Sequence, residues 1–458
     1  MAAKGALALG SPFTYHNESV ELWLSPNGIA IKGLKTEEIA WLDVLGAATA
    51  KNILSVFSCV QNQHGHRHLR ELKLASTANV DCEKFVHAIR YMAKMYPDHK
   101  EALLSIDEMA EKTPPQQRCL VVINPIGGPG RAVKIYESPV DAIFKAANIA
   151  VTSVITEAEY HAIKIAASLD LKAYDFMVCV GGDGLACEIV QGLMQRKDWQ
   201  EAIKFPLGII PGGSGNGLAK TLVFDVGVEY TVENCAFAIA KGKPQPIDIT
   251  TTRNEHQTSY GFLALSWAFI ADVDLKSEHF RFMGSARFTM AAVVKLLSLK
   301  RWSGRVKYLV DTSPGEMYWD ANHTSSDKPE TPLLANADND PSEKWETIEG
   351  RFNLFWASSV SHPSHDVHLV PGAQINDGFI YLAIMDGKAS VLEMASFLLA
   401  MEKGSHINSP SFRLIKTKAF ELKTDDNDFL SLDGERFHGG SAQVEVHRGL
   451  GRIIGLSP

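Results

Sequence analysis

Two stretches of the chain share one pattern, and this pattern restricts the fold more than any other feature. In residues 176–180 an apolar run leads into Gly181-Gly182-Asp183-Gly184, and a helical pattern follows. In residues 207–210 a second apolar run leads into the turn PGGSGNG at 211–217, and another helical pattern follows. Each stretch predicts a strand, a glycine turn and a helix. Such a turn directs backbone N–H groups and the positive end of a helix dipole at one point, which favours phosphate binding.

A third unit of this kind begins at Arg118. An apolar strand ending in Asn124-Pro125 runs into the glycine turn 126–130, and a strand at 149–156 and a helix at 160–168 come next. Alternating strands and helices predict a parallel sheet, whose ligands lie at the carboxyl ends of the strands. All three glycine turns follow such ends. The GxGxxG fingerprint of a dinucleotide-binding site does not open the first unit, and the sequence contains no GxxxxGK[ST] P-loop.

The turn at 181–184 also contains a carboxylate. An acidic side chain beside a bound phosphate repels it, so Asp183 is expected to act as a general base or as a metal ligand. The alternative is an ordinary turn in which Asp183 caps the next helix. Each glycine turn alone is a weak signal. Three of them in this order in one sheet predict phosphoryl transfer.

The composition sets limits on other functions. The 458 residues are too many for one core, so two or three domains are expected. A net charge of -8 argues against a nucleic-acid partner. No apolar run reaches the ~18 residues of a membrane-spanning helix. The six cysteines form no CxxC pair that would indicate a zinc site or a disulfide framework. We therefore expect a cytoplasmic protein.

Residues 1–113 are predicted to form a small β-rich domain and a linker. Apolar residues at helical spacing occupy 82–95, and the stretch 96–115 is charged. Several strands closed by a terminal helix are typical of the pleckstrin-homology fold, and a generic small β-domain without a ligand is the alternative. The strands are predicted at 20–24, 29–32, 39–41, 53–60 and 70–74.

The rest of the chain divides at about Pro246. Residues 114–246 hold the α/β units with the predicted parallel sheet. Residues 247–458 are rich in predicted strands, one of them at 260–270, and contain helical patterns at 286–300 and 390–403. The acidic stretch 311–344 is rich in Ser, Thr, Pro and Asn, so we expect a flexible, solvated loop there.

From about Arg118 to the C-terminus the chain resembles the diacylglycerol-kinase-like lipid kinases, and among them the sphingosine kinases. The resemblance covers about three quarters of the chain. Diacylglycerol kinases usually read GTGND where this chain reads GSGNG, and ceramide kinases lack the GSGN pattern. The motifs shared with sphingosine kinases, in the order that those kinases use, are NPxGGxG, GGDGLxxEIVQGLMQR, PGGSGN, SWAFIADVDLKSEHFRFMGSARFT, AMEKGSH and LDGE.

This resemblance implies a reaction and assigns residues to it. The implied reaction is ATP- and Mg²⁺-dependent phosphorylation of the primary hydroxyl of a sphingoid base, sphingosine or sphinganine, with Asp183 as general base. Asp274 would pair with the ammonium group of the base, and Asp433 would be the Mg²⁺ ligand. The implied ATP-binding residues are Asn124, Pro125, Ile126, Thr156, Glu188, Gly213, Ser214, Gly215, Arg281, Arg287, Asp433, Gly434 and Glu435. The implied substrate-binding residues are Gly181, Gly182, Gly184, Asp274, Phe269, Ile270 and Phe288.

The resemblance also implies an architecture. The region 114–246 would be the ATP-binding catalytic domain and 247–458 a β-sandwich that binds the lipid, with a last strand, 452–456, that returns to the nucleotide domain. The basic, amphipathic stretch 286–305 would contact a membrane surface, bind a calmodulin-like partner or act as a lid, whereas an ordinary surface helix is the alternative. We therefore expect peripheral recruitment to membranes.

The chain departs from the family pattern in its first glycine turn. Many sphingosine kinases carry Arg or an aromatic residue where Ile126 stands, and Lys or Arg where Pro129 stands. We therefore expect two phosphate contacts to be lost or replaced by contacts of Arg131. This change would alter the affinity for the nucleotide but not the class of reaction. A diacylglycerol or ceramide kinase of the same fold is one alternative, although the Asp274 carboxylate argues against lipids without an amine. A non-catalytic lipid-binding relative is the other.

Overall fold

The computed structural model describes residues 9–33, 36–77, 80–95, 105–277, 296, 300–310, 313–321, 327–337, 343–426 and 428–457. The chain forms two compact units, each assembled from separate stretches. Unit 1 comprises Met1–Cys119, Tyr136–Thr152 and Thr231–Gly242, and unit 2 comprises Leu120–Ile135, Ser153–Tyr230 and Lys243–Pro458. Neither unit coincides with one predicted domain, because helices from the α/β region belong to the N-terminal unit.

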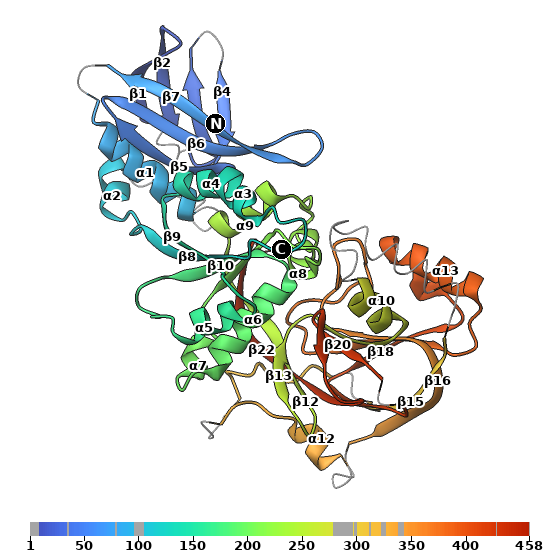
Figure 1. The fold of residues 1–458 in the computed structure, drawn as a ribbon. Helices are drawn as coiled ribbons and strands as arrows, with labels where there is room; N and C mark the ends of the chain where they lie inside the picture. Colours follow the sequence, from blue (N-terminus) through green and yellow to red (C-terminus); the bar gives the residue numbers. More distant parts are fainter. Residues whose placement is uncertain are drawn as a thin grey trace. The chain divides into compact units, whose positions relative to one another are not determined.

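An antiparallel sheet of seven strands is the framework of unit 1 (Figure 1), in the order β4-β3-β2-β1-β7-β6-β5. The five strands predicted in this region are present. The sequence does not predict β1 and β5, because Pro12 interrupts the former and the latter is rich in glycine and alanine, which have low strand propensity. The bounds are β1 (Leu9–Tyr15), β2 (Glu18–Leu24), β3 (Gly28–Lys32), β4 (Glu37–Ala40), β5 (Val44–Ala50), β6 (Ile53–Gln61) and β7 (Arg67–Ser76).

Two helices follow this sheet in the chain. Helix α1 (Cys82–Met95) has the bounds that its apolar spacing predicts, and its buried face joins the core of the sheet. Helix α2 (Ile106–Glu111) lies within the predicted linker, so that part of the linker prediction is wrong. Ser105 and Glu108 form a reciprocal capping box at its start. A helix of this length has too few apolar positions to show a period in the sequence.

Unit 1 is completed by η1 (Tyr136–Val140), α4 (Asp141–Ala146) and α9 (Val232–Lys241). Polar contacts join α9 to the sheet. The Oδ1 atom of Asn234 accepts a hydrogen bond from the Arg67 backbone N–H at 3.0 Å, and its Nδ2 donates to the Gly65 carbonyl at 2.9 Å. The N-terminal strands are therefore held to a helix that follows the PGGSGNG turn in the chain.

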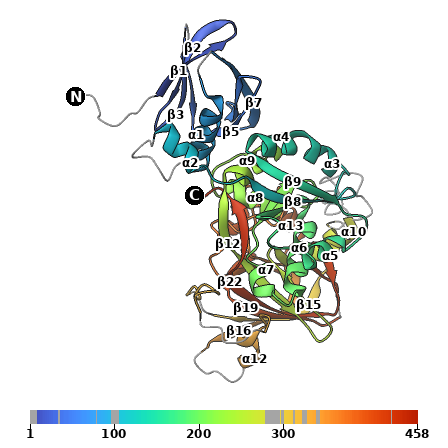
Figure 2. The ribbon, with the colours of Figure 1, turned by 90° about the vertical axis from the view of Figure 1, so that its left-hand side faces the viewer.

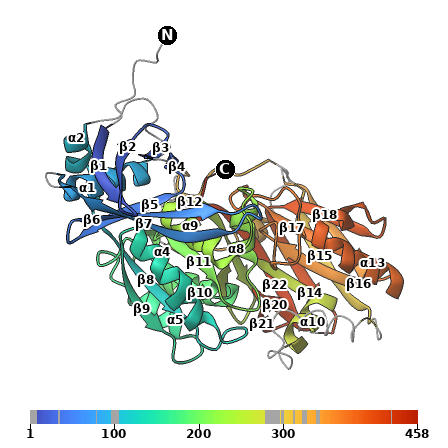
Figure 3. The same ribbon diagram turned by 90° about the horizontal axis from the view of Figure 1, so that it is seen from above.

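A mixed sheet runs through unit 2 along the path β21-β20-β14-β16-β15-β19-β22-β11-β10-β8-β9. Strands β12 and β13 join it at β22, and β17 and β18 join it at β16. β10 and β11 pair in parallel, as the α/β units predict, and Figure 3 shows β9, β8, β10 and β11 near one another. The bounds are β8 (Gln117–Ile123), β9 (Ile149–Ile155), β10 (Phe176–Gly181), β11 (Leu207–Pro211), β12 (Lys243–Arg253), β13 (Thr258–Gly261), β14 (Ala264–Ala268), β15 (Trp302–Leu309), β16 (Trp345–Ser358), β17 (Ile380–Asp386), β18 (Phe412–Thr417), β19 (Ala419–Thr424), β20 (Leu430–Leu432), β21 (Glu435–Phe437) and β22 (Ser441–Gly455).

The long strand β22 joins the β-rich region to the parallel strands. It runs antiparallel to β12, beside which Figure 2 shows it in red, and it pairs in parallel with β11 through Leu207 and Ile453. The implied return of the last strand to the α/β strands is thereby confirmed. The β-rich region and the strands that carry the glycine turns are consequently parts of one sheet.

Helices connect and cover these strands. Helix α13 confirms the helical pattern predicted at 390–403, with Ser390 as its N-cap and a 3-10 turn as its end. The bounds in unit 2 are α3 (Ala132–Ile135), α5 (His161–Ala167), α6 (Asp183–Gln195), α7 (Trp199–Ala202), α8 (Gly217–Phe224), α10 (Phe269–Ser277), α12 (Pro332–Asn336), α13 (Val391–Ala400), η3 (Met401–Lys403) and η4 (Ser405–Asn408).

Two predictions for the C-terminal half need correction, and a third falls largely outside the described residues. The strand predicted at 260–270 is two strands, and helix α10 begins at Phe269, after Ala268 turns the backbone to a φ of 65°. The sequence does not indicate this boundary, because the apolar run continues from the strand into the helix. Of the amphipathic stretch 286–305, residues 286–295 and 297–299 lie outside the described residues, and its end belongs to strand β15. The described parts of the acidic stretch 311–344 are held by contacts: they include α12, and the Trp319 indole donates to the Leu450 carbonyl at 2.9 Å.

Within the described residues, no helix is both long enough and apolar enough to cross a membrane.

We predict that Lys241→Met destabilises unit 1. The Lys241 ammonium donates to the carbonyl oxygens of Trp41 at 3.1 Å and Val44 at 3.0 Å, and also to that of Ala93. Methionine leaves these partly buried acceptors without their donor, so we expect a loss of about 2 kcal/mol in the free energy of unfolding. Urea unfolding measures it, with exposed Lys197→Met as the matched control. Equal stability of the two variants would contradict the prediction.

Candidate active site

The three glycine turns meet at the carboxyl ends of β8, β10 and β11. A Cβ atom placed on Gly213 would lie 2.5 Å from the Cα of Gly182, and one placed on Gly128 would lie 2.7 Å from the carbonyl carbon of Gly213. The Gly212 N–H also donates to the Gly181 carbonyl at 2.8 Å. The backbones therefore touch, and no side chain fits between them. This contact brings together the turns that the sequence predicts at one end of the sheet.

Two asparagine side chains shape these turns. The Asn124 Oδ1 accepts hydrogen bonds from the backbone N–H groups of Ile126 at 3.0 Å and Gly127 at 3.1 Å. The buried Asn216 side chain bonds both backbone groups of Gly213, accepting from the N–H at 3.2 Å and donating to the carbonyl at 2.8 Å. Ile126 is 72% exposed at the tip of its turn. Asn216 is absent from the predicted site residues, although its place at the end of GSGN marks it as a turn residue.

Asp183 is the first residue of α6 and lies buried beneath the turns. Its Oδ2 accepts from the Gly217 N–H at 2.6 Å and its Oδ1 from the Leu218 N–H at 3.1 Å. Both donors belong to the first turn of α8, where backbone N–H groups have no partner within the helix. Asp183 therefore caps a helix, but α8 rather than the helix that it begins. The carboxylate is fixed in position between the second and third turns.

Burial, with a smaller contribution from the negative charge of Asp433, raises the pKa of Asp183 to about 6, although the two N–H donors act in the opposite direction. Such a value leaves the carboxylate ionised at neutral pH and basic enough to accept a proton. A fixed position and a pKa near the working pH are two properties that a general base needs.

Asp433 reaches the same region from the turn between β20 and β21. Its backbone is left-handed, with a φ of 53°. Its Oδ1 accepts from the Ala264 N–H at 2.8 Å, and its Oδ2 lies 3.0 Å from the donating thiol of Cys187. Burial raises the pKa of Asp433. The end of strand β13 approaches so closely that a Cβ atom on Gly261 would lie 2.4 Å from Asp433 Oδ2. The sequence does not predict the contact between Cys187 and Asp433, because the two residues are 246 positions apart in the chain.

The remaining predicted residues divide by location. A Cβ atom on Gly184 would lie 3.9 Å from Glu435 Oε1, so the LDGE turn faces the start of α6. Glu188 lies on the same helix, where its Oε2 accepts from the Ala162 N–H at 3.2 Å, and burial raises its pKa. Thr156 and Ser214 are buried at the ends of β9 and β11. The structure thus groups the described residues of the predicted nucleotide site around the three turns.

The predicted lipid-site residues are not all placed. Phe269 and Ile270 begin α10 and are buried in the core of the β-rich region. Asp274 lies on α10, but the position of its side chain is outside what the structure describes. Arg281, Arg287 and Phe288 lie outside the described residues.

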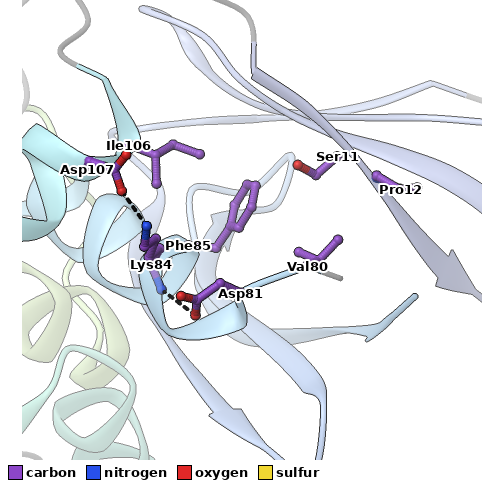
Figure 4. A pocket seen from close by; sticks show the side chains of 8 residues that line it. All are labelled: Ser11, Pro12, Val80, Asp81, Lys84, Phe85, Ile106 and Asp107. Atoms are coloured by element: carbon purple, nitrogen blue, oxygen red, sulfur yellow. Dashed lines mark hydrogen bonds and ion pairs between the residues drawn. The ribbon is translucent and has the colours of Figure 1, made fainter. Parts of the chain in front are cut away.

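Figure 4 shows a pocket of about 470 Å³ in unit 1, between strand β1 and helices α1 and α2. Phe85 lines it beside an ion pair of Lys84 with Asp107 at 2.6 Å. The pocket contains none of the predicted site residues.

Comparison with known proteins finds a family domain over the residues that contain the three turns. Residues 118–252 match the model of the diacylglycerol kinase catalytic domain. A crystal structure of a diacylglycerol kinase from Bacillus anthracis superposes with a TM-score of 0.52 at 17% identity, covering 74% of this chain and 97% of that one. A region of the chain therefore matches the diacylglycerol kinase catalytic domain, and the chain shares the fold of that structure.

Relatives that match over most of the chain show the family to which the chain belongs. Sphingosine kinase 1 of Arabidopsis thaliana is 33% identical over 70% of this chain and 68% of its own length. Human sphingosine kinase 1 is 31% identical over 72% of this chain and 88% of its own length. Sphingoid long chain base kinase 4 of Schizosaccharomyces pombe is 30% identical over 70% and 71%. The chain belongs to the sphingosine kinase family.

We predict that Gly213→Ala inactivates the site. The added methyl group would lie 2.5 Å from the backbone of Gly182 and push apart the turns that hold Asp183. Since a displacement of about 1 Å can cost about a hundredfold in rate, we expect at least a tenfold loss of kcat/KM for ATP. Gly315→Ala is the control, because nothing lies within 4 Å of a Cβ atom there. Wild-type activity in folded Gly213→Ala would show that the turns tolerate separation.

Proposed function

We propose that this kinase phosphorylates the primary hydroxyl of a sphingoid base with Asp183 as the general base. The hydroxyl oxygen attacks the γ-phosphorus of ATP, its proton passes to an Asp183 carboxylate oxygen, and the bond to the bridging oxygen breaks to leave ADP. The observation that carries this proposal is the buried Asp183 carboxylate, fixed by two N–H donors and with its pKa raised to about 6. Phosphoryl transfer needs chiefly such positioning, together with electrostatic stabilisation of the transferred group.

We propose that the same three turns bind the nucleotide. Members of this kinase family use ATP, and we assign its phosphates to the backbone N–H groups of the glycine turns. The proposed contact residues around them are Asn124, Pro125, Ile126, Thr156, Glu188, Gly213, Ser214, Gly215, Asp433, Gly434 and Glu435, with Arg281 and Arg287 from the sequence. The family resemblance and the grouping of the described members support this assignment.

A magnesium ion fits the acidic side of the site. Burial raises the pKa of both Asp183 and Asp433, and the negative charge of Asp433 adds to the shift at Asp183; a divalent cation would relieve this accumulation of negative charge. Among the described residues, no group of three or more His, Cys, Asp or Glu could hold a metal ion. Mg²⁺ suits this situation, because it commonly binds one or two carboxylates together with substrate phosphates. We propose Asp433 as the protein ligand; the ion would neutralise charge on the phosphates.

The lipid is assigned to the β-rich region. We propose that Asp274 pairs with the ammonium group of the base and that the tail enters near Phe269 and Ile270. A desolvated charge pair discriminates against diacylglycerol and ceramide, because these lipids would leave the carboxylate unpaired. Asp274→Asn should therefore weaken sphingosine binding much more than ATP binding, which steady-state kinetics separates.

The three-domain division and the membrane contact are also proposals. The seven-stranded sheet with α1 supports a pleckstrin-homology-type module at 1–113, followed by a catalytic domain at 114–246 and a lipid-binding β-sandwich at 247–458. The basic stretch before Trp302 would recruit the kinase to anionic membranes or bind a calmodulin-like partner. Co-sedimentation with phosphatidylserine vesicles, with and without charge reversal at Lys300 and Arg301, tests the recruitment.

We predict that Mg·ATP labels only free sphingoid bases in a lipid panel. The panel contains sphingosine, sphinganine, phytosphingosine, diacylglycerol and ceramide in detergent micelles, with transfer of radiolabelled phosphate as the readout. Asp183→Asn should lower the rate by about 10²–10⁴-fold, the usual contribution of a general base. Labelling of diacylglycerol or ceramide would refute the assignment of Asp274, and an active Asp183→Asn enzyme would remove Asp183 as the base.

We also predict an acidic limb near pH 6 in the pH profile of kcat/KM for Mg·ATP. Asp183 accepts a proton only when ionised, and its pKa is raised to about 6, so activity should fall as the pH drops through that value. This parameter reports the free enzyme, in which the nucleotide and metal charges are absent. A profile that stays flat down to pH 5 would mean that another group, or none, accepts the proton.

A further inference from the structure

The position of the proposed base depends on where helix α8 begins. Both hydrogen bonds to the Asp183 carboxylate come from the first two N–H groups of α8, those of Gly217 and Leu218. A small shift or rotation of this end of the helix would move both donors together. Whatever holds the start of α8 in place therefore also sets the direction of the carboxylate.

A segment of the β-rich region, residues 359–371 between β16 and β17, makes that contact. The Thr221 hydroxyl, one turn into α8, accepts a hydrogen bond from the His362 backbone N–H at 3.2 Å. The Ser361 hydroxyl lies 3.5 Å from the Thr221 hydroxyl and 2.9 Å from Nδ1 of His362. Thr221, Ser361 and His362 are all buried. We call these three residues the Thr221 clamp.

The backbone of the same segment also contacts Gly217, the first residue of α8. A Cβ atom on Gly217 would lie 2.4 Å from the carbonyl oxygen of His362 and 2.6 Å from the carbonyl carbon of Pro363. The segment backbone thus lies directly against the residue whose N–H binds Asp183. Only two short links, a backbone contact and a hydrogen bond, separate the clamp from the carboxylate.

The His362 ring packs rather than carries charge. It stacks on His368 with the ring centroids 4.4 Å apart and contacts Phe224 of α8 at 4.5 Å. Burial lowers the pKa of His362 to about 3, and His368 and Lys220 contribute in the same direction. The neutral ring therefore extends the contact between the segment and α8 along the helix.

The far end of the segment is fixed to the turns after α13. The His368 N–H donates to the Met401 carbonyl at 2.9 Å, and Nε2 of His406 lies 2.9 Å from the Leu369 carbonyl. A Cβ atom on Gly404 would lie 2.8 Å from Pro371. The segment is thus anchored at both ends, as a rigid positioning element must be.

We propose that the Thr221 clamp positions the start of α8 and thereby the Asp183 carboxylate. Thr221 is a positioning residue in this proposal, because it acts through the Gly217 and Leu218 N–H groups. The proposal rests on the proposed role of Asp183 as the base. It assigns to the β-rich region a part in orienting the catalytic group, in addition to binding the lipid.

The test compares Thr221→Val with a matched threonine. Valine keeps the shape of the buried side chain but removes the hydroxyl that His362 and Ser361 contact. Since sub-ångström misplacement of a catalytic group lowers the rate strongly, we expect about a tenfold loss of kcat with KM for ATP and sphingosine within about twofold. Thr221→Ser should restore most of kcat. The control is Thr252→Val, because the buried Thr252 hydroxyl has no hydrogen-bond partner in the described structure.

A double-mutant cycle separates positioning from general destabilisation. If the clamp acts through Asp183, Thr221→Val should leave the residual rate of Asp183→Asn unchanged, because coupled residues are not additive. An equal loss in both backgrounds, or a kcat of Thr221→Val within about twofold of wild type, would overturn the proposal. If Thr221→Val does not fold, Ser361→Ala is judged by the same criteria. High activity of Asp183→Asn alone would instead refute the proposed base.

Discussion

Backbone contact among the three glycine turns is the constraint on which the site depends. The Gly182 and Gly213 backbones are so close that a single methyl group would lie 2.5 Å from its neighbour, and Gly128 closes on the same point. Because no side chains intervene, N–H groups from three separate loops can converge on one phosphate-sized region. The parallel order of the strands makes this possible, since it brings their carboxyl ends to one edge of the sheet.

The long strand β22 connects this edge to the β-rich region. It pairs with β11, which carries the PGGSGNG turn, and with β19 and β12. The LDGE turn precedes it in the chain, so the same connection brings Asp433 close enough for its charge to raise the pKa of Asp183. The proposed nucleotide site and the proposed lipid-binding region therefore share one sheet, which would bring ATP and an apolar substrate to neighbouring parts of the structure.

The sequence predicts what depends on local pattern and misses what depends on distant contacts. The strand–turn–helix units, α1 and α13 follow from apolar periodicity and capping residues, and the structure confirms them. The boundary at Phe269 is invisible, because one apolar run spans strand and helix. Cys187 and Thr221 could not be assigned, since their partners Asp433 and His362 lie 246 and 141 residues away. The role of Asp183 as cap of α8, rather than of its own helix, needed the structure for the same reason.

The electrostatics of Asp183 result from two opposed effects. Burial and the charge of Asp433 favour the protonated form, whereas two backbone N–H groups favour the carboxylate. Burial thus makes the carboxylate a stronger base, and the two N–H donors limit that increase, which suits the proposed transfer of a proton to Asp183. The start of α8 supplies the second effect, so its exact placement determines basicity as well as direction. A contact that fixes α8 therefore bears on the chemistry even though it touches neither ATP nor lipid.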